Sequence, residues 1–521
     1  MVAPRWMIVW IGCIYLLPTA WLSAAEPITA AAMTRRVDEL INAKLADEKI
    51  PPGELATDAE FLRRASVDLD GRVPRVSEVR AFLADSRPDR RAILIDELLA
   101  KPTHSTHLAT MWRRVLLPEN ADITRFGGDR GFEFWLRQQF VDNVPYDKIA
   151  RDVLLAEGQA SQGPTLFYTA FENKPEQLAA ATSRVFLGLQ IECAQCHDHP
   201  HDQWKQEDFW GYAAFFARLQ KPNGQQTGVL MVADSDTGEV EHPLTGKPVP
   251  PRFLGTDVDV KPIAEQSRRA QLATWMTSPE NDYFARAAVN RAWAMLFGRG
   301  LVEPVDDLGR HNPPSHPQLM QELADYFVAT NYDLQNLVRV LANTEAYQRT
   351  SRMRDGETPT KPELFARMAI KTFTAEQLYD SLQVATVRRE MPNAGMNELG
   401  IAGFDANRAA FLDKFRGPKG SASEYHAGIP QALTLMNGTL VEAATNVETS
   451  DLLRALQAPF FTNEQRVETL FLATLGRLPH DDEREKYLSY FEGQATDTER
   501  RAALGDMLWA LLNTAEFTLN H

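Results

Sequence analysis

Cysteine is scarce in this sequence, which contains only three cysteines in 521 residues. Cys193 and Cys196 lie mid-chain, whereas Cys13 lies in an apolar segment near the N-terminus. So few cysteines exclude a disulfide-stapled scaffold, and the core must therefore be held by ordinary burial. At about 100–200 residues per domain, the length predicts two to four domains.

Basic residues are outnumbered, with 55 Lys and Arg against 70 Asp and Glu and a net charge of -15. Such an acidic surface argues against nucleic acid and anionic membranes as partners. The sequence also lacks a phosphate-cradling glycine loop, H-E-x-x-H and G-x-S-x-G, so the corresponding enzyme classes lose support. No catalytic residue is identified, and the sequence leaves open whether the protein is an enzyme.

A long hydrophobic run occurs only at the N-terminus. Arg5 precedes "WMIVWIGCIYLLPTAWL", and small residues, Ser23 and Ala25, follow where a signal peptidase reads. We interpret residues 1–25 as a signal peptide, with an uncleaved anchor as the alternative. The protein is then exported to the periplasm or beyond the cell, with no membrane span after the signal. Cleavage removes Cys13 and Arg5 and changes the net charge from -15 to -16.

Strand-like alternation is also scarce, and helical spacing dominates. "PDRRAILIDELLAKP" and "SHPQLMQELADYFVATN" place apolar residues three and four apart and stop at Pro or near Asn. The clearest alternation follows residue 226, in a stretch rich in Pro and Gly. We therefore predict a mainly α fold, with helical domains at 26–220 and 263–521 joined by an irregular insert at 221–262 with minor β structure.

One pattern occurs twice, as "GRVPRVSEVRAFL" from Gly71 and "GRLPHDDEREKYL" from Gly476. Each predicts a helix that ends at glycine, followed by a second helix with an acidic first turn. We expect Arg72 and Arg477 to reach back to free carbonyls of the preceding helix. A duplicated helical hairpin and a chance recurrence both explain the pattern.

The remaining thiols are concentrated in "IECAQCHDHPHDQW", residues 191–204, together with His197, His199 and His201. Residues 193–197 fit the C-x-x-C-H pattern that attaches c-type haem. On a helical turn, residues three apart share a face, so both sulfurs can reach the two vinyl groups of the porphyrin. The next imidazole then binds the iron. We predict Cys193 and Cys196 as haem anchors and His197 as the axial ligand.

The surroundings of the motif are interpreted in the same way. We expect the helix "AAATSRVFLGLQI" to run straight into it, and Asp198 and Asp202 to cap a helix or face solvent rather than support the histidines. The aromatic residues that follow are expected to wall a macrocycle: Trp204, Phe209, Trp210, Tyr212, Phe215 and Phe216. The iron's sixth position stays open, with these candidates: His199, Met231, His242 and Met436.

Two alternatives remain for the cluster. The thiolates can join the histidines, which an extended segment would turn to one side, in a tetrahedral site for zinc or another transition metal. They can also form a short, redox-labile disulfide. The alternative functions are therefore an exported metal-binding protein or hydrolase acting on polysaccharide, and a non-catalytic interaction protein.

Two further loops carry polar residues. The carboxylates and imidazoles of the first loop can do acid–base chemistry. The end of this loop also has a structural interpretation, with Ser315 as the N-cap and Pro317 as the first residue of the next helix. The residues of the first loop are Asp306, Asp307, Arg310, His311 and His316. The second can bind a polar ligand such as a glycan through Arg416, His426, Gln431 and Asn437. Asn290 and Trp293, three apart on one helix, are expected to pack.

At the cluster the sequence resembles a family. "FLGLQIECAQCHDHPHDQWKQEDFWGYAAFF" and "EFLRRASVDLDGRVPRVSEVRAFLAD" are similar to a cytochrome-like domain of unknown function that is abundant in planctomycete bacteria. "YFARAAVNRAWAMLFGRGLVEPVDDLG", "PPSHPQLMQELADYFV", "IPQALTLMNG" and "ATLGRLPHDDERE" resemble the planctomycete-specific domain that usually follows it. The resemblance implies an exported protein of unassigned reaction. Separately, we expect its partner to be a redox partner protein or a glycan.

The resemblance also bears on the ligand set. The family tends to an aromatic residue where this chain has His201, so His201 is not implied as a ligand. The residues that the resemblance carries over are Cys193, Cys196, His197 and His199, the last two as candidate metal ligands.

Overall fold

The protein is mainly α-helical with minor β structure, as predicted. The computed structural model describes residues 28–118, 130–159, 163–220, 231–353, 356, 360–386, 406–415, 436 and 438–521. The predicted signal peptide lies outside these residues, so export stays a prediction. Within them, no helix combines the length and the apolar character needed to cross a membrane.

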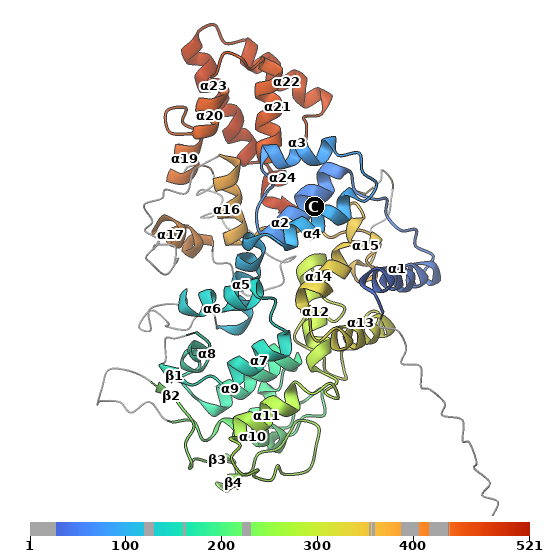
Figure 1. The fold of residues 1–521 in the computed structure, drawn as a ribbon, viewed down its shortest axis with the longest axis vertical. Helices are drawn as coiled ribbons and strands as arrows, with labels where there is room; N and C mark the ends of the chain where they lie inside the picture. The colour runs from blue at the N-terminus through green and yellow to red at the C-terminus, as the bar shows by residue number, and fades with distance from the viewer. Residues whose placement is uncertain are drawn as a thin grey trace, which may run out of the picture.

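The elements follow one another as short to medium helices (Figure 1). Those up to residue 213 are α1 (Ala30–Asp47), α2 (Asp58–Asp70), α3 (Val76–Ala84), α4 (Arg90–Leu99), α5 (Pro102–Leu116), α6 (Arg130–Val141), α7 (Tyr146–Leu154), α8 (Thr165–Ala170), α9 (Pro175–Thr182) and α10 (Gln206–Ala213). Those from residue 268 to 385 are α11 (Arg268–Met276), α12 (Phe284–Phe297), α13 (Pro317–Ala329), α14 (Leu334–Ala342), α15 (Glu345–Gln348) and α16 (Ala375–Ala385). The later ones are α17 (Ala406–Phe415), α19 (Thr439–Thr445), α20 (Asp451–Leu456), α21 (Asn463–Thr474), α22 (Asp481–Glu492), α23 (Asp497–Leu512) and α24 (Ala515–Thr518).

In the described part of the chain, the strands form three antiparallel pairs of two residues each. These are β1 (Gly158–Gln159) with β2 (Met231–Val232), β3 (Val240–Glu241) with β4 (Pro248–Val249), and β5 (Lys371–Thr372) with β6 (Leu519–Asn520). Strands β2, β3 and β4 all lie in the segment predicted as an irregular β insert.

Two hydrophobic clusters form the interior. The larger one contains side chains from both predicted helical domains, and Tyr146 of the first stacks on Phe284 of the second with 5.4 Å between ring centroids. The smaller one joins Val67 and Val73 to residues from 373 to 517. Helices α19–α23 lie at one end of the molecule, and α9–α11 lie at the other (Figure 1). Because the two predicted domains share this core, the packing does not show where one ends and the other begins. The boundaries at 220 and 263 therefore remain a prediction.

Helix α2 is buried on all sides although it carries many charges. Its buried charged residues are Glu60, Arg63, Arg64, Asp68 and Asp70. Asp68 illustrates how they are accommodated, because its carboxylate accepts from Lys371 Nζ at 2.6 Å, Tyr347 Oη at 2.9 Å and Asn520 Nδ2 at 2.7 Å. Hydrogen bonds of this kind offset the cost of removing charge from water. They also tie the C-terminal strand to the larger core.

The repeated pattern forms two similar helix–turn–helix hairpins, α2–α3 and α21–α22. Gly71 and Gly476 have φ of +73° and +70°, the left-handed conformation that glycine adopts without strain. The hairpins also touch each other through α3 and α21. The predicted glycine ends of the two first helices are therefore confirmed.

The expectation for the two arginines is wrong. Arg72 lies 3.5 Å from Glu78 and Arg477 lies 2.6 Å from Glu483, each glutamate being in the first turn of the following helix. Each arginine also donates to the carbonyl of the residue directly after it, at 3.3 Å and 3.1 Å. Arg72 also lies 2.9 Å from Asp70, the last residue of α2, so it reaches back to a carboxylate and not to a free carbonyl. A charge-assisted bond to a carboxylate is stronger than one to a neutral carbonyl. The matching pairs favour a duplicated hairpin.

Candidate functional site

The cysteine–histidine cluster lies on a surface loop before α10. Cys193 belongs to a 3₁₀ turn, Glu192–Gln195, and Cys196 follows it directly. Because residues three apart eclipse each other in a 3₁₀ helix, the two side chains leave the turn on the same side. Both thiols are exposed and free of a disulfide.

The helix before the cluster ends earlier than predicted. After α9 the chain makes a π-helical turn, Ser183–Leu187, and leaves the helix at Gly188, whose φ of +65° is left-handed. The cluster is therefore held by loop contacts rather than by a continuous helix.

His197 and His199 are set up differently. The Nδ1 atom of His197 lies 2.8 Å from the carbonyl oxygen of Asp198. Since a carbonyl only accepts, this nitrogen carries the proton, and Nε2 keeps the lone pair that binds a metal. The Nδ1 atom of His199 instead accepts from the backbone N–H of His201 at 3.3 Å, which places its proton on Nε2. Of the two, His197 has the tautomer that suits an axial ligand through Nε2.

The loop from 197 to 205 is folded, not extended. The backbone N–H of His199 donates to the carbonyl of Trp204 at 2.7 Å. Asp198 accepts from the N–H of Gln206 at 3.0 Å, at the first turn of α10, so its predicted capping role is confirmed. The expected one-sided row of histidines does not form, and in the ranges that the structure describes no three His, Cys, Asp or Glu side chains are grouped to hold a metal ion.

The aromatic residues after the motif lie beneath the loop. Trp210 is half-buried and donates from Nε1 to the carbonyl of Gln195 at 3.1 Å, which ties the 3₁₀ turn to α10. The others are packed in the larger core: Trp204, Phe209, Tyr212, Phe215 and Phe216. The structure thus places them as support for the loop and not along an open cavity, because burying their apolar area stabilises the fold.

The loop 302–312 of the second half packs against the cluster. The backbone N–H of Leu308 donates to the carbonyl of Gly188 at 2.7 Å, and Gln190 donates to Asp306 at 3.0 Å. Arg184 lies 2.5 Å from Glu192 and 3.5 Å from Asp306, linking the two halves by charge. Two loops that the sequence presents as separate candidates therefore form one site.

His311 is the centre of this contact. Its Nε2 lies 3.1 Å from Asp307 Oδ2, and its Nδ1 lies 3.5 Å from Asp202 Oδ2. Its ring faces that of His199, with centroids 6.2 Å apart and 30° between the planes. The Asp202 side chain is 3% exposed, so the expectation that it faces solvent is wrong. It contacts a histidine of the other half instead.

Gly309 makes this approach possible. A Cβ atom there would lie 2.3 Å from Asp202 Oδ2 and 2.7 Å from His311 Nδ1. A side chain there would displace the Asp202 carboxylate or the His311 ring, so glycine at this position lets the two side chains approach each other. In the sequence, the glycine two residues before His311 is the one local sign that this loop makes a close contact.

Tyr283, Arg184, Gln190 and Glu192 also belong to the site, although sequence reasoning missed them. The ring of Tyr283 lies 6.4 Å from that of Trp204 under the loop. Burial raises the pKa of Tyr283, with the Arg310 charge acting against it and Asp202 acting with it. Burial also raises the pKa of Glu192. These side chains carried no motif that would mark them.

His316 lies outside the site. It is itself the N-cap of α13, so the assignment of that role to Ser315 is wrong, while Pro317 is the first helical residue as predicted. Burial lowers the pKa of His316 to about 4. Asn290 is buried, and its amide Nδ2 donates to the carbonyls of Val302 and Val305 at 2.9 Å and 3.0 Å. Its predicted packing role is therefore confirmed, and its hydrogen bonds hold the start of the loop 302–312.

The other candidates are dispersed. Met231 lies in β2, and His242 lies beside the β3–β4 turn, where its Nδ1 accepts from the N–H of Leu244. Met436 contacts Trp509 of α23, at the opposite end of the molecule from α10 (Figure 1). The residues expected to bind a glycan, Arg416, His426, Gln431 and Asn437, lie outside the described residues.

Comparison with known families matches both halves. Residues 36–221 match PSCyt2, described as a protein of unknown function (DUF1549), and residues 268–400 match PSD1, described as a protein of unknown function (DUF1553). The chain therefore carries these two planctomycete-type domains of unknown function in the order that the sequence resemblance implies. No curated protein and no solved structure is significantly similar to it. The site thus joins the PSCyt2 domain, with the cluster, to the PSD1 domain, with His311.

Proposed function

We propose that this PSCyt2–PSD1 protein is an exported c-type haem-binding protein with a role in electron transfer. Cys193 and Cys196 are the covalent anchors, and His197 is the axial ligand. The observation that carries the proposal is the state of these three side chains. Both thiols are free and leave one turn on the same side, and the His197 tautomer leaves Nε2 unprotonated.

The chemistry of attachment fits free thiols. Each S–H adds across one vinyl C=C bond, with sulfur bonding to one carbon and hydrogen to its neighbour, so no oxidant or reductant is consumed. A Cys193–Cys196 disulfide would first require reduction. When bound, haem supplies one-electron redox chemistry that amino acids lack.

The protein's own residues hold the attachment loop. Asp198 and Trp210 fix it to α10, and the Asp202–His311–Asp307 contacts of the PSD1 domain hold its far side. An exposed motif on a firmly held loop suits electron exchange with a partner protein that docks there.

The test is periplasmic expression with the haem-attachment machinery present, followed by a visible spectrum and elemental analysis. We expect a Soret band that survives acid–acetone extraction in the wild-type protein. It should be lost in the Cys193→Ser/Cys196→Ser variant, and kept, with a changed spectrum, in His197→Ala. His201→Phe is the matched control and should retain the wild-type spectrum. Stoichiometric zinc in a colourless protein would overturn the proposal in favour of the metal-binding alternative. The absence of both haem and zinc would overturn it in favour of a non-catalytic interaction protein.

A further inference from the structure

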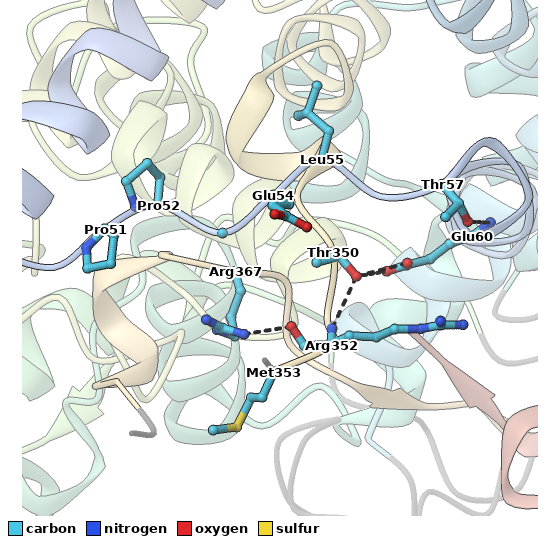
Figure 2. A pocket seen from close by; sticks show the side chains of 11 residues that line it. Pro51, Pro52, Glu54, Leu55, Thr57, Glu60, Thr350, Arg352, Met353 and Arg367 are labelled. Carbon is cyan, nitrogen blue, oxygen red and sulfur yellow. Dashed lines mark hydrogen bonds between the residues drawn. The ribbon is translucent and has the colours of Figure 1, made fainter. Parts of the chain in front are cut away.

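A separate cavity of about 220 Å³ lies between the loop that joins α1 to α2 and the chain after α15 (Figure 2). Its walls are held by backbone hydrogen bonds. Gly53 N donates to the carbonyl of Ala366 at 2.7 Å, and Thr350 N donates to that of Glu54 at 2.8 Å. Because the bonds join segments far apart in sequence, the cavity is formed before any ligand arrives.

The cavity has an apolar rim and a polar floor. Leu55 and Met353 are 58% and 46% exposed at the rim, beside Pro51 and Pro52. The floor includes the buried carboxylate of Glu60, which accepts from Arg64 at 2.8 Å, Ser351 N at 2.9 Å and Thr350 Oγ1 at 2.9 Å. The negative charge of the floor is therefore already compensated.

Arg352, an exposed residue, brings an unpaired positive charge to the edge of the cavity. Its side chain extends away from Arg367 and beneath Glu60 (Figure 2), and it also lines a second cavity of about 20 Å³. Within the described part of the chain, its guanidinium has no hydrogen-bond or ion-pair partner.

Arg63 lines the same second cavity. Its guanidinium donates to the backbone carbonyls of Thr474 at 2.9 Å, Glu516 at 2.9 Å and Phe517 at 2.8 Å. Its buried Nε has no partner among the described residues. Burial, helped by the charge of Arg477, lowers the pKa of Arg63 to about 10. Arg477 differs, because it pairs with Glu483 and Glu516.

The two cavities together combine positive charge, apolar surface and hydrogen-bond acceptors. We infer that they bind a small organic carboxylate that also carries hydroxyl or ammonium groups. The carboxylate pairs with the Arg352 guanidinium, whose planar fork matches its two oxygens. The carbon skeleton packs against Leu55 and Met353, and the hydroxyl or ammonium groups donate to oxygen atoms of the floor such as Thr350 Oγ1. The site is independent of the cysteine–histidine cluster.

The test is calorimetric titration of the full chain with matched pairs of small molecules. D-Glucuronate carries hydroxyl groups and L-leucine carries an ammonium group, and D-glucose and leucinamide are their counterparts without a carboxylate. We expect one of the acids to bind at least about tenfold more tightly than its counterpart, since hydrogen bonds to charged groups have that strength. Which acid binds identifies the source of the donor groups.

Variants assign the binding to Arg352. Arg352→Gln should weaken the preferred acid at least about tenfold, and Arg352→Lys should fall between, because it keeps the charge and loses the fork. Arg454→Gln, an exposed arginine of α20 that pairs with Asp451, is the matched control and should leave binding unchanged. The melting temperature of Arg352→Gln should equal that of the wild type. Equal binding of acid and counterpart, unchanged binding by Arg352→Gln, or sulfate binding as tightly as the acids would each overturn the inference.

Discussion

Helix α2 and the loop 191–204 both contain many ionisable or metal-binding side chains. On α2 most of these side chains are buried, whereas on the loop several of them are exposed. The carboxylates of Glu60 and Asp68 on α2 have several partners each. On the loop, Cys193, Cys196 and His197 are exposed. Groups that the fold has already paired contribute to stability, whereas groups that it leaves accessible remain available to a ligand. This contrast supports the role proposed for the loop.

The largest effect should come from breaking the α2 network at Asp68. Asp68→Leu leaves the Lys371 ammonium buried without its carboxylate, which costs about 3–5 kcal/mol of unfolding free energy. Urea unfolding measures the loss. The double variant Asp68→Leu/Lys371→Met removes both charges and should recover much of it. Equal losses in the single and double variants would mean that the ion pair is not what holds this region.

A second prediction concerns His107, which packs on Gly71 at the end of α2. Burial, helped by His104, lowers its pKa from 6.5 to about 4 in the folded protein. Between these pH values the unfolded chain binds a proton that the folded protein does not, so stability falls as the pH falls. From pH 7 to 4 the contribution of His107 should decrease by about 3 kcal/mol.

The control for this prediction is the same pH series on His107→Gln, which cannot titrate in this range. Its unfolding free energy should fall less steeply than that of the wild type between pH 6.5 and 4. His316, which is buried, and His521, which is half-buried, also have pKa values lowered to about 4 and stay in both proteins. Burial lowers the pKa of His104 as well, so part of the slope remains. Parallel curves would contradict the prediction.

A smaller effect is expected where the PSD1 domain meets the cluster. Gly309→Ala would place a Cβ atom 2.3 Å from Asp202 Oδ2, so the Asp202 and His311 side chains or the loop 302–312 must shift. Overpacking of this kind costs about 1–3 kcal/mol. Hydrogen exchange of residues 197–204 should become faster, because the His311 contact is lost. Gly493→Ala at the end of α22 is the control and should leave that exchange unchanged. Equal exchange rates in the two variants would mean that the loop 302–312 does not hold the cysteine–histidine cluster.

The helical class could be predicted from the sequence because apolar spacing, glycine stops and proline starts are local signals. The glycine ends at Gly71 and Gly476 were predicted for this reason. The partners of Arg72 and Arg477 were not, because the choice between a carbonyl and a carboxylate depends on the path of the chain after the turn. The core shared by the two halves is likewise a matter of tertiary packing.

The same limit applies to the site. The motif around Cys193 is visible because its chemistry depends on spacing along the chain. The contact of Asp202 with His311 is not, because 109 positions separate them and only the fold brings them together. The aromatic residues after the motif were misread for a related reason, since large rings that pack a core and rings that line a cavity look alike in sequence.

The smallest effect on stability should come from the cysteines themselves. Protein made without haem and kept reduced should lose less than about 0.5 kcal/mol in Cys193→Ser/Cys196→Ser, because both thiols are exposed and free of a disulfide. Urea unfolding beside Asp68→Leu measures the contrast directly. A loss close to that of Asp68→Leu would mean that the thiols already hold the loop, through a metal ion or each other. In that case α2 and the loop would differ only in how deeply their side chains are buried. The cysteines would then stabilise the fold rather than form a site kept open for a cofactor.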